Sequence, residues 1–102
     1  MNVKLELIRE DLEAGITRIF MNRPPVNSCT SGFLDQIANL LDQLAADASI
    51  KAVILASSGK VFSAGMDLKE ALAFDLADEQ AIVRSFNITT TKLFAFPKPL
   101  IV

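Results

Sequence analysis

The chain has 102 residues, of which 51% are apolar, and a net charge of −2. This length allows one domain at most, or part of one, and the charge excludes the basic footprint of a nucleic-acid-binding protein. No apolar run is long enough to cross a membrane, and the N-terminus lacks the basic start and apolar centre of a signal peptide. We therefore expect a cytoplasmic protein without a membrane partner.

The absence of histidine and the single cysteine limit the types of catalysis and metal binding that this chain can support. The sequence holds no histidine, which excludes Ser-His-Asp and Cys-His nucleophilic systems within this chain. No group of cysteines and carboxylates has the spacing of metal ligands, so we expect no metal site. The single cysteine, Cys29, excludes an internal disulfide, and we expect it to be a small buried or loop residue rather than a reactive thiol.

Alternation of apolar and polar residues predicts a β-hairpin at the start of the chain. The strands are expected over 3–9 and 16–21, with a polar turn over 10–15 between them. Prolines and asparagines over 22–27 predict a loop after the hairpin. The apolar fraction is high for so short a chain, which indicates that part of its surface meets further chain or other subunits.

Thr30 or Ser31 is expected to cap a helix that ends at 48–49. Its buried face consists of apolar residues at three- and four-residue steps, namely Leu34, Ile37, Leu41, Leu44 and Ala48. A short buried strand follows over 51–57. A helix between two strands in this order favours a right-handed crossover that joins parallel strands.

The second half of the chain predicts two more helices. A short one is expected over 67–73, and a long one over 78–94, after an irregular link. We expect the long helix to turn Ile82, Phe86 and Leu93 inward, although the threonines at 89–91 are weak helix formers. Prolines then end this helix before a last buried strand over 100–102.

The most informative segment lies between the strand over 51–57 and the short helix. Its sequence is Lys60-Val61-Phe62-Ser63-Ala64-Gly65-Met66-Asp67-Leu68-Lys69-Glu70. A glycine flanked by small residues at a strand-to-helix junction can leave backbone N–H groups unpaired and directed outward. Such donors can bind the oxygen of a polarised carbonyl.

This segment resembles the oxyanion loop of the crotonase family, also called the enoyl-CoA hydratase/isomerase family. Three further blocks resemble the same family in the same order: Asn22-Arg23-Pro24, Lys51-Ala52-Val53-Ile54-Leu55 and Phe96-Pro97-Lys98-Pro99-Leu100-Ile101-Val102. The resemblance implies an α/β, crotonase-like fold of ββα units, in which a β-hairpin and parallel strands combine with helices. It also implies an incomplete domain, with residues 1–102 as the N-terminal portion of a single crotonase-like domain.

The resemblance implies that the protein binds fatty acyl-CoA thioesters and stabilises a thioester enolate, without a cofactor. The backbone N–H of Met66 is the implied first oxyanion donor, and Gly65 gives the chain freedom to turn sharply there. The remaining substrate-binding residues implied by the resemblance are Pro25 and Val26 along the pantetheine arm, Ser63 and Ala64 at the adenine, and Asp67, Leu68 and Lys69.

Two of these assignments have alternatives. Lys69 meets a CoA phosphate or is a solvated helix charge, and Asp67 is more simply a helix cap than a general base. Glu70 is expected to be a helix-surface charge. The residues over 24–28, Pro-Pro-Val-Asn-Ser, resemble the turn of Δ3,Δ2-enoyl-CoA isomerases, which favours isomerase slightly over hydratase.

The family's second oxyanion donor and its acid/base residues lie beyond the matched blocks, so we expect negligible activity from these residues alone. The family also implies a homo-oligomer, either a trimer or a hexamer. The alternatives are a truncated, non-catalytic CoA-binding or self-associating protein, and a plain α/β domain in which 62–70 is only a turn. Binding of acyl-CoA without turnover favours the first alternative, and absence of CoA binding favours the second.

Overall fold

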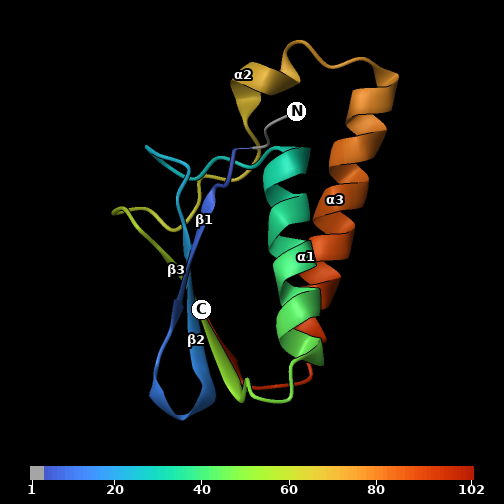
Figure 1. Cartoon of the computed structure of the whole chain (residues 1–102). Coiled ribbons are helices and arrows are strands. Elements are labelled where there is room, and N and C mark those ends of the chain that lie inside the picture. Colours follow the sequence, from blue (N-terminus) through green and yellow to red (C-terminus); the bar gives the residue numbers. More distant parts are fainter. Residues whose placement is uncertain (1–3) are drawn as a thin grey trace.

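A computed structural model of the chain describes residues 4–102. A four-stranded sheet with the order β1-β2-β3-β4 carries two long helices, which lie side by side on one side of it (Figure 1). The strands are β1 (Leu7–Asp11), β2 (Ile16–Met21), β3 (Ala52–Ser57) and β4 (Leu100–Ile101). The helices are α1 (Ser31–Ala46), α2 (Leu68–Ala71) and α3 (Leu76–Phe94), and a 3-10 turn, η1 (Glu13–Gly15), closes the hairpin.

The pairing of the strands confirms the predicted topology. β1 and β2 are antiparallel, whereas β2 with β3, and β3 with β4, are parallel. β1 begins at Leu7 rather than at residue 3, because the Glu6 N–H and the Lys4 carbonyl bond to the side chain of Gln36 in α1 and not to β2. Residue 3, at the start of the predicted strand, lies outside the described residues.

The core lies between the sheet and the two helices. Alternate side chains of β2 and β3 are buried against the apolar face of α1, and Ile82 of α3 completes this cluster. Cys29 is buried at its edge, as expected of a small packed residue. Phe33 at the start of α1 has no exposed surface and is the largest fully buried side chain.

The end of α1 differs from the prediction. The helix stops at Ala46, and Ala48 is exposed rather than part of the buried face. The Asp47 carboxylate accepts hydrogen bonds from the Ser49 N–H at 2.9 Å and from the Ser49 hydroxyl at 2.6 Å. An aspartate that bonds the backbone two residues on favours a turn, so the local side-chain chemistry ends the helix early.

α3 is longer than predicted and is not weakened by its threonines. It begins at Leu76, where Asp75 and Asp78 form a reciprocal capping box. The Thr89 hydroxyl is buried and donates to the Leu34 carbonyl of α1 at 3.0 Å. Ile82 is buried as predicted, and Phe86 and Leu93 pack partly buried against the core. A tertiary contact thus overrides the low helix propensity of threonine.

Candidate functional site

Two loops meet at one edge of the sheet. The 22–30 loop follows β2 and the 58–67 loop follows β3, and both leave the sheet at the same edge because β2 and β3 are parallel (Figure 1). Cys29 and Met66 form an isolated parallel bridge between the loops. Cys29 N–H donates to the Gly65 carbonyl at 2.6 Å, and Asp67 N–H donates to the Cys29 carbonyl at 3.0 Å.

Gly65 adopts a backbone conformation that other residues rarely take. Its φ is +88°, and no heavy atom lies within 4 Å of the position that a Cβ would occupy. The glycine is therefore required by the backbone conformation and not by crowding. Its N–H donates to the Ser63 hydroxyl at 3.1 Å, and that hydroxyl donates to the Asn27 carbonyl at 2.8 Å.

In the part of the chain that the structure describes, the Met66 N–H is the one uncommitted backbone donor of the four consecutive residues 64–67. Ala64 N–H donates to the Val26 carbonyl at 2.9 Å, and the N–H groups of Gly65 and Asp67 are bonded as described above. Within residues 4–102, the Met66 N–H has no acceptor. In a planar trans peptide the N–H points opposite to the C=O. Since the Gly65 carbonyl faces Cys29, the Met66 N–H is directed away from it.

Asp67 caps α2, as the sequence predicts. One carboxylate oxygen, Oδ1, accepts from Glu70 N–H at 3.1 Å, and the other, Oδ2, lies 3.1 Å from Arg23 Nη1. The hydrogen bond from Glu70, with that from Arg23, holds the pKa of Asp67 below its ordinary value. Asp67 is therefore an ionised structural group.

Two residues that sequence reasoning did not assign hold the loops in place. Asn27 is buried, and its Nδ2 donates to Ser57 Oγ at 2.9 Å and to the Phe62 carbonyl at 2.9 Å. Arg23 joins Glu6, Ser28 and Asp67. The signal available in the sequence was the pair of hydrogen-bonding side chains that flank the two prolines of the 22–27 loop.

A groove of about 560 Å³ runs along the junction of the two loops. Its walls include seven of the predicted substrate-binding residues, namely Pro25, Val26, Ala64, Met66, Asp67, Leu68 and Lys69. Ser63 does not line it, because its hydroxyl is engaged beneath the loop with Asn27. Lys4, Glu6, Arg23, Pro24 and Ser28 complete the wall.

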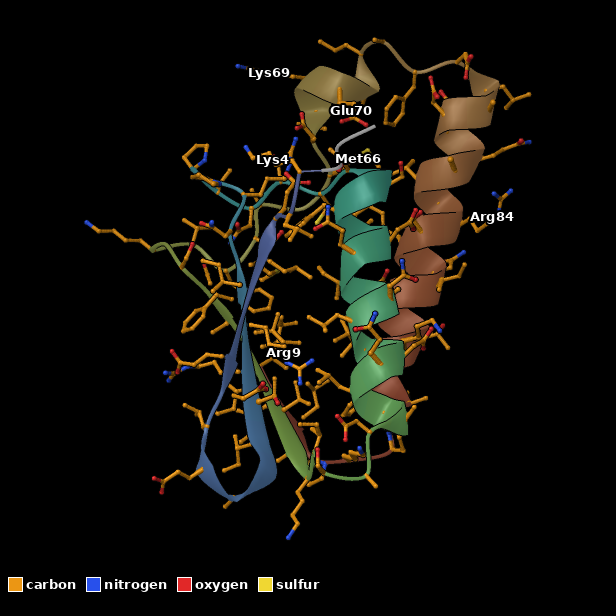
Figure 2. All side chains as sticks on the ribbon, viewed as in Figure 1. Lys4, Arg9, Met66, Lys69, Glu70 and Arg84 are labelled. Carbon is orange, nitrogen blue, oxygen red and sulfur yellow. The ribbon has the colours of Figure 1, made fainter. Side chains whose placement is uncertain are left out.

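Figure 2 labels three residues of the groove wall, Lys4, Met66 and Lys69. Met66 lies near the N-terminal end of α1, and Lys69 extends outward from α2. Lys69 and Glu70 are both exposed, as expected of helix-surface charges. No helix within residues 4–102 combines the length and the apolar character that crossing a bilayer requires.

Comparison with known proteins points to one family. The family model described as "Enoyl-CoA hydratase/isomerase" matches residues 11–102. A probable enoyl-CoA hydratase of Bacillus subtilis is 30% identical over 82 residues, which are 79% of this chain and 32% of that protein. The mitochondrial enoyl-CoA delta isomerase 1 of Rattus norvegicus is 43% identical over 68 residues, which are 66% of this chain and 24% of that protein.

Solved structures agree with these matches. The human mitochondrial delta3-delta2-enoyl-CoA isomerase superposes with a TM-score of 0.88 at 30% identity, over 94% of this chain and 38% of that one. An enoyl-CoA hydratase from Bacillus anthracis gives a TM-score of 0.85 at 26% identity, with the same coverage. The predicted crotonase-like α/β fold is confirmed. The chain spans about a third of the length of the B. subtilis relative.

Proposed function

Because the chain belongs to the enoyl-CoA hydratase/isomerase family, we propose that its groove binds an acyl-CoA thioester and that the Met66 N–H is the first donor to the thioester oxygen. The observation that carries this proposal is the uncommitted Met66 N–H among bonded neighbours. A fixed donor aimed at an oxygen that gains negative charge is the core of oxyanion stabilisation, and one such donor contributes about 3–4 kcal/mol to the transition state.

The other groove residues then serve the remaining parts of the ligand. Pro25 and Val26 face the pantetheine arm. The Ala64 N–H is already bonded to Val26, so the adenine amino group bonds to carbonyl oxygens of Ser63 and Ala64. Lys69, which is exposed at the groove wall, meets a CoA phosphate. The CoA thioester is the substrate, and no cofactor takes part.

The proposed reaction passes through a thioester enolate, as hydration of an enoyl-CoA or as a Δ3-Δ2 double-bond shift. Relatives named for each reaction match this chain, so the reaction class stays open between them. We propose that residues 1–102 form the N-terminal portion of one crotonase-like domain, and that the second oxyanion donor and the acid/base group come from its other part. A cytoplasmic location stays a prediction, since some relatives are named mitochondrial.

Equilibrium binding to two matched ligands tests the role of the Met66 N–H. Hexanoyl-CoA carries the thioester carbonyl, whereas S-hexyl-CoA is a thioether without it. A neutral hydrogen bond contributes about 1 kcal/mol, so we expect hexanoyl-CoA to bind about fivefold more tightly. M66P removes the N–H and should abolish this preference. M66A keeps the N–H and should retain it.

The outcomes separate clearly. Loss of the preference in M66P but not in M66A supports the proposal. No binding of either ligand by the unchanged chain, or an equal preference in M66P and M66A, would overturn it. If M66P does not fold, the Met66 amide proton signal serves instead, since it should shift with hexanoyl-CoA and not with S-hexyl-CoA.

We also propose that the protein is a homo-oligomer, a trimer or a hexamer. Large apolar side chains at the end of α3 and beyond α2 are strongly exposed, with Phe94 at 96% and Leu72 at 90%. Ile101 of the edge strand β4 is also exposed. Apolar surface and open strand edges favour association. Sedimentation should show association, and a monodisperse monomer at micromolar concentration would contradict it.

A further inference from the structure

Arg23 lies at the centre of an ionic cluster on the wall of the groove. Its Nε is 2.8 Å from Glu6 Oε2, and its Nη1 is 3.1 Å from Asp67 Oδ2. Nη1 also donates to the carbonyl and the hydroxyl of Ser28, both at 2.8 Å. The three charged side chains are each less than one-third exposed.

The partners of Arg23 flank the bridge that aims the Met66 N–H. Ser28 directly precedes Cys29, and Asp67 directly follows Met66. One guanidinium thus binds both of the loops that the Cys29–Met66 bridge joins, in each case at the residue next to the bridge. The direction of the Met66 N–H follows from the peptide plane it shares with the Gly65 carbonyl, and that carbonyl is held by Cys29 N–H.

We infer that Arg23 is a positioning residue, which fixes the direction of the Met66 N–H by fastening Ser28 to Asp67. The inference rests on the function proposed above. A planar guanidinium presents several donors in fixed directions, so it can hold the Glu6 carboxylate, the Ser28 oxygens and the Asp67 carboxylate at once. A lysine at position 23 has a single ammonium group and cannot reach all of these acceptors in the same geometry.

The same geometry argues against a phosphate-binding role for Arg23. Glu6 and Asp67 are two carboxylates on one guanidinium, so the local cluster carries no excess positive charge. Lys4 and Lys69 also line the groove, and neither forms an ion pair within residues 4–102. A phosphate of CoA would therefore bind these lysines rather than Arg23. Substitution of Arg23 should weaken binding of the ligand's thioester carbonyl and leave binding of its CoA part unchanged.

The ratio of dissociation constants for S-hexyl-CoA and hexanoyl-CoA tests this inference. We expect the ratio to fall from about fivefold to below about twofold in R23M, because a misdirected N–H no longer meets the carbonyl. The affinity for S-hexyl-CoA should change less than about twofold. R9M is the matched control, since Arg9 pairs with Asp11 in an exposed position and lies well away from Met66 in Figure 2. It should keep the full ratio.

Substitutions at Asp67 and a milder change at Arg23 extend the test. D67N keeps an oxygen for the Glu70 N–H but loses the charge that binds Arg23, so it should lower the ratio as R23M does. The double variant R23M/D67N should lower it no further, because both changes break one link. R23K should restore part of the ratio. If R23M does not fold, D67N and R23K decide the question by the same measurement.

The failure of this inference differs from the failure of the proposed function. A ratio that stays near fivefold in R23M and D67N, while M66P abolishes it, overturns the role of Arg23 and leaves the Met66 donor in place. A ratio near one in the unchanged chain overturns both. A loss of S-hexyl-CoA affinity in R23M equal to the loss of hexanoyl-CoA affinity also overturns the inference, since it shows a general effect on the groove.

Discussion

Replacement of Gly65 by alanine should destabilise the protein through backbone strain alone. A side chain at φ +88° costs about 1–2 kcal/mol, whereas the open space around the Cβ position adds no steric term. If the backbone relaxes to negative φ instead, the Gly65 carbonyl turns away from Cys29 N–H and the Met66 donor loses its direction. Only this second response should lower the preference for hexanoyl-CoA over S-hexyl-CoA, whereas a strained but unchanged backbone should lower stability alone.

Two other glycines provide the scale for this measurement. Gly59 does not adopt the left-handed backbone conformation, and the atom nearest to a Cβ there, Ser57 Oγ, would be 3.8 Å away. G59A should therefore change the free energy of unfolding by less than about 0.5 kcal/mol. Gly15 has φ +78°, and a Cβ there lies 2.6 Å from the Ser49 carbonyl oxygen, so G15A should exceed the cost of G65A. Urea unfolding should therefore show the smallest loss of stability for G59A, a larger one for G65A and the largest for G15A. Equal stability of G65A and G59A would refute the reasoning.

Three further predictions concern the core, a buried hydrogen bond and acid stability. F33A removes a fully buried ring and should cost about 3–5 kcal/mol in urea unfolding. T89V removes the hydroxyl that bonds the Leu34 carbonyl and should cost about 1 kcal/mol by the same measurement. Bonds from Glu70 N–H and Arg23 lower the pKa of folded Asp67, so its contribution to stability is present above its ordinary pKa near 3.8 and is lost as pH falls through the lowered value. In D67N, the free energy of unfolding should therefore fall less steeply as pH is lowered into the acid range. The same slope in D67N and the unchanged chain would contradict the lowered pKa of Asp67.

Local patterns were sufficient to predict the sheet and the helices. Alternation in β2 and the spacing of the apolar residues in α1 reflect burial on one side of each element, which is a property of neighbours in sequence. The errors occurred where another interaction decided the outcome. Asp47 ends α1 early by bonding Ser49, and Thr89 is stabilised in α3 by a residue 55 positions away.

The site was predicted in part for the same physical reason. Gly65 and the Asp67 cap belong to one short segment, so their roles follow from local chemistry. Arg23 and Asn27 act on residues that are 44 and 35 positions away, respectively, and no periodicity pairs them. Their roles became visible only when the two parallel strands brought their loops to one edge of the sheet.

The carboxylates of the groove explain why we expect no turnover from these residues alone. Within the described residues, the groove is lined by two carboxylates, Glu6 and Asp67, and both bind Arg23. Asp67 also binds Glu70 N–H and has a lowered pKa, whereas a general base works best with a pKa near the working pH. Proton transfer by a placed side chain contributes about 10²–10⁴-fold, and neither group is free to supply it.

Under the proposed function, the groove holds the thioester and the Met66 N–H stabilises the enolate, while the proton moves through a group outside residues 1–102. An assay of the 102-residue chain for enoyl-CoA hydration and double-bond shift should therefore show negligible turnover, even where hexanoyl-CoA binds. Robust turnover that survives D67N would mean that a group other than Asp67 accepts the proton within this chain. Robust turnover lost in D67N would instead make Asp67 the base, against its capping role.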